Sequence, residues 1–248
     1  MTRLLRRFLA LIGSTIATTL TVWAQAPATP PAASPEINKP FVNPDVKGYV
    51  AKFETESREV YAQREAIVRT LELKKGMAVA DIGAGTGAFT RLIAERVGPE
   101  GKVYAVDISP AFLEHIAKEA ERLGHAHVKT VQGTQQSTRL AVGSIDLAFL
   151  CDVYHHLENP TATLASIRRA LKPKGVLVVV DFDRVKGKSS AFVLEHVRAD
   201  QSTFAAEIKA AGFVPLDTPR PPPLQENFLL RFRKVDDAVR KNDGPVGE

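Results

Sequence analysis

The chain has 248 residues, of which 44% are hydrophobic, so it can form one large domain with a buried core and some appended segments. Its net charge of +5 is small and much of the excess lies near the two ends, which argues against a nucleic-acid-binding surface. Cys151 is the single cysteine, and this excludes an internal disulfide and any cysteine-based metal site.

Residues 1–24 have the pattern of an export signal. Three arginines precede a mostly apolar run that ends at Ala24, and small residues surround that position. We therefore expect a mature protein that begins near Gln25 and is periplasmic or secreted. A membrane contact is expected only if the segment stays attached as an anchor. If residues 1–24 are not a functional signal, the protein is cytoplasmic.

Two segments separate this signal from the first expected strand. Residues 25–44 are rich in proline and alanine and are predicted to form a linker that contains no helix and buries little surface. Residues 45–75 carry apolar side chains at helical spacing and are predicted to form an N-terminal helical cap.

The next stretch is the most informative one in the chain. An apolar run reaches Asp81 and Ile82, and Gly83, Gly85 and Gly87 then alternate with small residues. This pattern predicts a strand, a tight turn and a helix, with a ligand lying across the turn against the positive end of the helix. The spacing differs from the G-x-G-x-x-G fingerprint of dinucleotide-binding proteins, which disfavours a nicotinamide-dependent oxidoreductase. No Gly-Lys-Ser/Thr follows, so a phosphate-binding loop is excluded.

Strands and helices are expected to alternate along the rest of the chain, which predicts an α/β fold with helices on both faces of a mostly parallel sheet. Asp107 ends the second strand about twenty residues after the turn, where a carboxylate can accept hydrogen bonds from both ribose hydroxyls. The expected strands are 77–82, 103–107, 128–132, 145–153, 176–182, 213–216 and 228–232. The expected helices between them are 88–97, 109–123, 159–172 and 203–211.

Asp81-x-Gly-x-Gly-x-Gly together with Asp107 resembles class I S-adenosylmethionine-dependent methyltransferases, and most of all the small-molecule group related to quinone and sterol methyltransferases. The resemblance runs from about Gly76 to Val235. It implies a methyltransferase domain over 76–235, a Rossmann-like doubly wound sheet of about seven strands with an antiparallel last strand, and S-adenosylmethionine as the cofactor. Residues 236–248 are expected to form a flexible tail.

The resemblance also implies a set of cofactor contacts. Asp81 would face the methionine ammonium group and Asp107 the ribose, although either carboxylate can instead cap its turn. The family usually has an acid after the third strand that accepts from the adenine amino group; Thr134 or Gln135 stands here and offers an oxygen in its place. The further expected cofactor contacts are Gly83, Ala84, Gly85, Gly87, Ile108 and Cys151.

The acceptor is expected after the fourth strand, where Tyr154, His155 and His156 are the catalytic candidates. The proline motif of amine-methylating enzymes is missing, so methylation of nucleic-acid bases is disfavoured. One of the two histidines can take a proton from the acceptor during methyl transfer. Alternatively, one histidine packs in the core and the other caps a helix.

Other polar residues give weaker indications. Asp152, Asp181 and Asp183 can together hold Mg²⁺, but solvated acids at strand ends are the favoured interpretation, and no metal is expected. The segment 184–201, with Glu195, His196 and Arg198, is expected either to contact the substrate or to form a surface helix. The resemblance likewise places Tyr61 and Arg64 of the cap near the pocket, with an ordinary surface helix as the favoured alternative.

The sequence therefore predicts an exported enzyme that transfers a methyl group from S-adenosylmethionine to a small molecule. Because this cofactor is made in the cytosol, an exported protein that binds S-adenosylmethionine or S-adenosylhomocysteine without catalysis is the second hypothesis. Loss of the glycine turn or of Asp107 would favour that hypothesis, and both are present.

Overall fold

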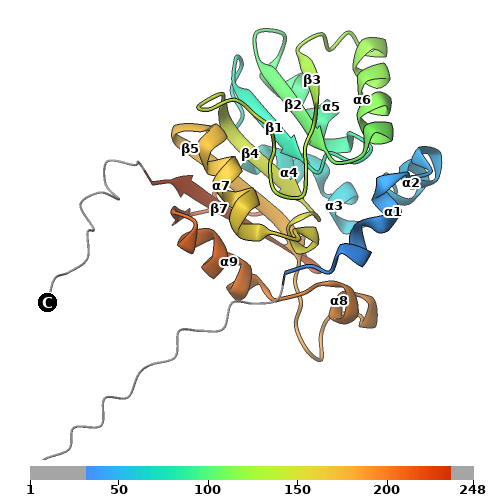
Figure 1. Ribbon diagram of the computed structural model, residues 1–248, viewed down its shortest axis with the longest axis vertical. Coiled ribbons are helices and arrows are strands. Elements are labelled where there is room, and N and C mark those ends of the chain that lie inside the picture. The colour runs from blue at the N-terminus through green and yellow to red at the C-terminus, as the bar shows by residue number, and fades with distance from the viewer. Residues whose placement is uncertain (1–31, 236–248) are drawn as a thin grey trace, which may run out of the picture.

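A seven-stranded sheet with the order β3-β2-β1-β4-β5-β7-β6 forms the centre of the computed structural model, which describes residues 32–235 (Figure 1). The predicted signal segment and tail lie outside the described residues. Strands β1 to β5 run parallel, and β7 runs antiparallel to both β5 and β6. The predicted fold class is confirmed. The strands are β1 (Ala78–Ile82), β2 (Lys102–Asp107), β3 (Val128–Gln132), β4 (Ile145–Cys151), β5 (Leu171–Phe182), β6 (Phe213–Leu216) and β7 (Asn227–Lys234).

Helices cover both faces of the sheet (Figure 1). Alternate residues of a strand point to opposite faces. Thus Val79 of β1 packs in the cluster that includes α4 (Arg64–Thr70) and α5 (Ala88–Val97). Its neighbour Ala80 packs in the cluster that includes α7 (Pro160–Ala170) and α9 (Gln201–Ala210). The central strands are buried on both sides, as expected for a parallel sheet. The helices that follow the cap are α5 (Ala88–Val97), α6 (Pro110–Arg122), η2 (Tyr154–His156), α7 (Pro160–Ala170), α8 (Ala191–His196) and α9 (Gln201–Ala210).

The predicted linker is wrong in its second half. Residues 25–44 were expected to contain no helix, but η1 (Pro35–Asn38) and α1 (Lys39–Val42) lie there. Each begins with a proline in its first turn, where a missing backbone N–H costs nothing because no partner is needed. Asn38 is buried and donates from Nδ2 to the carbonyl of His156 at 3.0 Å and to Glu158 at 2.8 Å. These contacts attach the segment to the domain.

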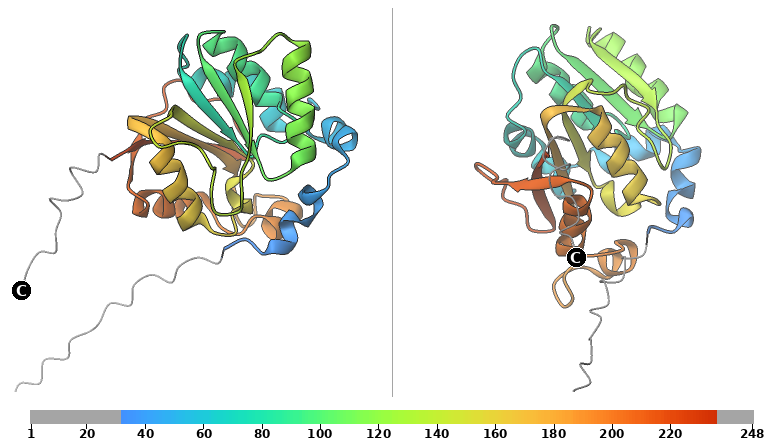
Figure 2. Two further views of the ribbon diagram at one scale, coloured as in Figure 1. Left: turned by 45° about the horizontal axis from the view of Figure 1, so that its top comes forward. Right: turned by 60° about the vertical axis from the view of Figure 1, so that its left-hand side comes forward.

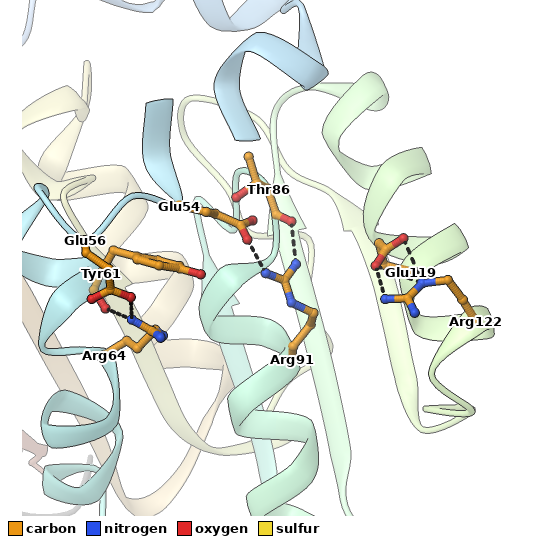
Figure 3. Close-up of polar contacts among 8 residues, drawn as sticks. All are labelled: Glu54, Glu56, Tyr61, Arg64, Thr86, Arg91, Glu119 and Arg122. Carbon is orange, nitrogen blue, oxygen red and sulfur yellow. Dashed lines mark hydrogen bonds and ion pairs between the residues drawn. The ribbon is translucent and has the colours of Figure 1, made fainter. Parts of the chain in front are cut away.

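The cap consists of three short helices rather than one, namely α2 (Val46–Phe53), α3 (Glu59–Ala62) and α4 (Arg64–Thr70). Arg91 of α5 attaches α2 to the glycine turn, since it pairs with Glu54 at 2.5 Å and donates to the Thr86 carbonyl at 3.3 Å (Figure 3). The views in Figure 2 show α1 and α2 along the same side of the domain as α8. No helix between residues 32 and 235 combines the length and apolar character that crossing a bilayer requires.

Candidate active site

A cavity of about 570 Å³ lies between the carboxyl ends of the parallel strands, the cap and α8. This is the position at which parallel α/β sheets bind ligands. Predicted site residues in its lining are Asp81, Gly83, Ala84, Gly85, Asp107, Ile108, Thr134, Gln135, Cys151, His155 and His156. The structure thus brings eleven predicted residues together, and their ligand contacts remain predictions.

The glycines of the turn serve different purposes. Gly83 and Gly85 both have positive φ, of 72° and 55°. A Cβ at Gly83 would lie 2.4 Å from a methyl group of Val153, whereas a Cβ at Gly85 would find its nearest atom, in Phe53, only at 3.9 Å. Gly83 is therefore required for packing, whereas a Cβ at Gly85 would make only an ordinary van der Waals contact with the cap.

Gly87 does not line this cavity, which contradicts its prediction as a cofactor contact. It takes φ of 79° at the start of α5, and a Cβ there would lie 2.8 Å from Ile116 of α6. The third glycine thus allows the chain to enter the helix beside α6 and faces away from the ligand site. Local glycine spacing could not separate these two roles.

Asp81 and Asp107 are both buried in the cavity wall. Asp81 Oδ2 accepts from the Thr90 hydroxyl at 2.6 Å, and Asp107 accepts from the backbone N–H groups of Gly85 and Ser109, each at 2.9 Å. Burial raises the pKa of Asp81 to about 6, with a smaller contribution from the charge of Asp107. Burial also raises the pKa of Asp107 against its backbone hydrogen bonds. A ligand that brings positive charge or hydroxyl donors would offset this desolvation.

The cavity residues at the ends of β3 and β4 are Thr134, Gln135 and Cys151, which are polar but carry no carboxylate. Thr134 closes a small bridge with Ser137, and the Gln135 carbonyl accepts from Thr163 at 3.1 Å, so the backbone of this loop is held in place. Burial raises the pKa of the Cys151 thiol well above its usual value. Cys151 is thus a neutral wall residue and not an activated nucleophile.

His155 is held by Asp181, which lies at the end of β5. Its Nδ1 lies 2.7 Å from Asp181 Oδ1, and both side chains are buried. Burial by itself lowers the pKa of His155, but the charge and hydrogen bond of Asp181 outweigh burial, and the net shift is upward. Nε2 is buried without a hydrogen-bond partner among the described residues. The Asp181–His155 pair therefore leaves one ring nitrogen free for a ligand.

His156 and His196 lie beside this pair. The Nδ1 of His156 lies 3.2 Å from Asn38 Oδ1, and the His155 and His156 ring centroids are 4.2 Å apart. Burial lowers the pKa of His156 to about 2, and burial also lowers the pKa of His196. His196, the last residue of α8, lines the cavity, so the segment 184–201 contributes a side chain to the site. The sequence offered His196 only as one of two equal alternatives.

Tyr154 is wrong as a catalytic candidate. Its side chain is fully buried away from the cavity, its ring packs 4.8 Å from that of Phe204, and its hydroxyl donates to Glu207 at 2.9 Å. Burial and the Glu207 charge raise the pKa of its hydroxyl. In the short helix η2 successive side chains diverge, so Tyr154 enters the core while His155 faces the ligand space.

The three strand-end acids do not converge on a common point, and two of them are not solvated as expected. Asp152 is buried and pairs with Arg58 at 2.6 Å and with the amide of Asn227 at 2.7 Å. Asp181 is occupied by His155, and Asp183 does not line the cavity. Sequence reasoning missed Arg58 and Asn227 because both come from segments distant along the chain.

The cap and α1 supply an aromatic side of the cavity, of which only Tyr61 was named from the sequence. Its members are Tyr49, Phe53 and Tyr61 of the cap, Phe41 of α1, and Phe182 and Phe192 from the β5–α8 region. Of the two cap residues proposed from the resemblance, Tyr61 lines the cavity. Arg64 does not, since it pairs with Glu56 and stacks over the Tyr61 ring at 4.0 Å (Figure 3).

The family model for the methyltransferase domain matches residues 73–227, more than half of the chain, and the chain belongs to this family. The predicted methyltransferase class is therefore confirmed. The demethylmenaquinone methyltransferase of Geobacillus stearothermophilus is 28% identical over 118 residues, which cover 48% of this chain and 50% of that protein. An uncharacterized 37.1 kDa protein of transposon TN4556 from Streptomyces fradiae is 29% identical over 56% of this chain and 40% of its own length. The chain thus spans half or less of these relatives.

Solved structures agree on the fold. A SAM-dependent methyltransferase from Aquifex aeolicus superposes with a TM-score of 0.64 at 22% identity, covering 76% of this chain and 98% of that one. Geranyl diphosphate C-methyltransferase from Streptomyces coelicolor A3(2) does so with a TM-score of 0.58 at 17% identity, covering 70% and 80%. At these identities the likeness concerns the fold.

Proposed function

We propose that this protein transfers the methyl group of S-adenosylmethionine to a small molecule bound beside His155. One observation carries the proposal. The sheet order β3-β2-β1-β4-β5 arranges the cavity residues as Thr134, Asp107, Asp81, His155 and Phe182. The proposed ligands follow the same order, from adenine through ribose and methionine to the acceptor.

Methyl transfer from a sulfonium requires little from the protein beyond the alignment of donor and acceptor. The sulfonium already makes the methyl group electrophilic, so the enzyme has to hold donor and acceptor in line and exclude water. The cap closes over the glycine turn through Glu54 and Arg91, and this supports the exclusion of water. The unpartnered Nε2 of His155 is the group that the acceptor's reactive atom would meet.

For the acceptor we propose a flat, largely apolar molecule with an ionisable hydroxyl. The aromatic side of the cavity suits such a ring. The sequence similarity to demethylmenaquinone methyltransferases points to the same class.

Calorimetry with S-adenosylhomocysteine and with NAD tests the cofactor. We expect S-adenosylhomocysteine to bind once per chain and NAD not to bind. Binding of NAD alone would contradict the proposal. Radiolabelled S-adenosylmethionine with a panel of phenols, quinols and matched hydroxyl-free rings then tests the acceptor class.

We further propose that residues 1–24 direct export. The arginine-rich start, the apolar run and the small residues around Ala24 support this. Mass spectrometry of the native protein should find an N-terminus near Gln25 in the periplasmic or secreted fraction. An intact Met1 in the cytosolic fraction would contradict it.

A further inference from the structure

Three histidines converge where the acceptor is proposed to bind. His155 and His156 belong to η2, and His196 ends α8, so the cluster joins two separate segments. One ring nitrogen from each histidine lies within 4.8 Å of the others. The remaining histidines, His115, His125 and His127, are not part of this group.

We propose that His155, His156 and His196 bind one divalent transition-metal ion of the zinc class, with an open coordination position toward the cavity. Neutral imidazole nitrogens are preferred ligands of zinc and its neighbours, and oxygen-only ions such as Mg²⁺ are poorly served by such a set. Three protein ligands with one vacant position are typical of catalytic rather than structural zinc sites.

The neighbours of the two η2 histidines orient them as metal ligands. The Asp181 carboxylate offers only acceptors, so His155 Nδ1 is the donor in their 2.7 Å contact and Nε2 keeps its lone pair. The Nδ2 group of Asn38 already donates to two other oxygens, so its Oδ1 accepts from His156 Nδ1. A carboxylate or amide oxygen on the far nitrogen is the usual support of a metal-bound histidine.

The free nitrogen of His155 has no role in the fold. Nε2 is buried and has no partner among residues 32–235, and His155, which is 1% exposed, is one of the residues that line the cavity. A buried polar atom without a partner destabilises the folded state, and a bound metal ion would remove that penalty. Ring packing alone accounts for the contacts among the histidines but not for this nitrogen.

The ring nitrogens of the three histidines would have to move slightly closer together to bind one zinc ion. Nitrogens around a tetrahedral zinc ion are about 3.4 Å apart, given bonds of about 2.0–2.1 Å. His196 is the ligand that can move, because it ends a six-residue helix and is only partly buried. Its ring stacks on Phe192 at 4.8 Å, and Phe182 lies 5.8 Å from His155, so the metal would sit against an apolar wall.

The catalytic consequence rests on the proposed function, whereas metal binding itself does not. An acceptor hydroxyl bound at the open position would lose its proton to solvent more readily. Its oxygen would then form the bond to the methyl carbon as the carbon–sulfur bond breaks, releasing S-adenosylhomocysteine.

The test is a titration of the chelator-treated full chain with ZnCl₂, followed by calorimetry, and with Co²⁺, followed by visible absorption. We expect one ion per chain and the intense d–d bands of tetrahedral Co²⁺. His196→Ala should weaken Zn²⁺ binding by at least about a hundredfold, and Asp181→Asn by about ten- to a hundredfold. His125→Ala, which removes a histidine 5.6 Å from another imidazole ring at a different place, should leave binding unchanged.

Absence of Zn²⁺ binding, or equal affinity in His196→Ala and the unmodified chain, would overturn the inference. Loss of binding in His125→Ala but not in His196→Ala would also overturn it. Melting temperatures of the apo variants identify any that fail to fold, and His196→Ala, at the edge of the domain, is the variant expected to keep its fold. S-adenosylhomocysteine binding without Zn²⁺ binding would reject the metal site and leave the proposed function standing.

Discussion

Arg58 and Asp152 form an ion pair of 2.6 Å that joins the N-terminal cap to the loop after β4. The Asp152 side chain is 4% exposed and that of Arg58 28% exposed. Arg58→Met should lower the free energy of unfolding by about 1–3 kcal/mol, because Asp152 would stay buried with only Asn227 as a partner. Amide exchange of residues 46–62 should speed up.

Chemical denaturation and hydrogen exchange measure these effects. Lys39→Met is the matched control, since its pair with Glu36 is exposed on both sides. Arg58→Met combined with Asp152→Asn should recover part of the loss. A single Arg58 variant as stable as the Lys39 variant would show that the pair does not hold the cap.

Gly83 and Gly85 should respond differently to alanine. Both have positive φ, which costs an alanine about 1–2 kcal/mol. Gly83→Ala adds a clash with Val153 worth about 1–3 kcal/mol more, whereas Gly85→Ala meets no close atom. We expect Gly83→Ala to be the less stable variant and Gly85→Ala to fold but bind S-adenosylhomocysteine more weakly. Equal melting temperatures would contradict the assignment.

Asp107→Ala should weaken S-adenosylhomocysteine binding by about thirty- to a thousandfold. It would remove the two charge-assisted hydrogen bonds that we propose between Asp107 and the ribose, worth about 2–4 kcal/mol together. Asp107 also accepts from the Gly85 and Ser109 N–H groups, so the variant's melting temperature has to be measured alongside calorimetry. Asp183→Ala, outside the cavity, is the control. Unchanged affinity in folded Asp107→Ala would remove the ribose assignment.

Cofactor affinity should depend on pH through Asp81, whose pKa burial raises to about 6. The contact that we propose between Asp81 and the cofactor's ammonium group requires the ionised carboxylate. Affinity should thus be constant above pH 7 and fall as the pH drops through 6, by up to about tenfold per pH unit. Calorimetry across this range checks the trend. Asp81→Asn should bind weakly at every pH, and an equally steep fall in that variant would assign the effect to another group.

Asp81 should affect the stability of the unliganded protein in the opposite direction. Its folded-state pKa lies above the ordinary 3.8, so the folded chain binds the proton more tightly than the unfolded chain. This stabilising contribution is fully present below pH 3.8 and is lost as the pH rises through 6. Comparing melting temperatures of Asp81→Asn and the unmodified chain across this range isolates the contribution.

His155→Ala should leave S-adenosylhomocysteine affinity nearly unchanged and reduce methyl transfer by about a hundred- to ten-thousandfold. The loss is expected whether Nε2 takes the acceptor's proton or holds a metal ion, since both act at the acceptor. Single-turnover assays and calorimetry separate the two quantities, with His115→Ala as control. If folded His155→Ala transfers methyl groups at the normal rate, the acceptor does not bind beside η2.

Local sequence patterns were sufficient to predict the strands of the sheet and the residues on the proposed cofactor side of the site. Each strand is marked by its own apolar run. The glycine turn and Asp81 lie within one strand–turn–helix unit, and Asp107 ends the next strand. Parallel strands bring their carboxyl ends to one edge, so residues that follow successive strands meet without any knowledge of packing. The predicted strands and their parallel arrangement thus placed Asp81 and Asp107 at one edge of the sheet from the sequence alone.

Tertiary structure decided the acceptor side. Asn38 reaches His156 across 118 residues of sequence, and His196 meets His155 only because α8 folds back over the end of β5. Tyr154 packs against Phe204 in the core, and its neighbour His155 therefore faces the cavity. Which of the two residues packs in the core depends on the position of Phe204, which lies about fifty residues further along the chain. Such contacts depend on how distant segments pack in three dimensions, and composition and spacing carry no record of that packing.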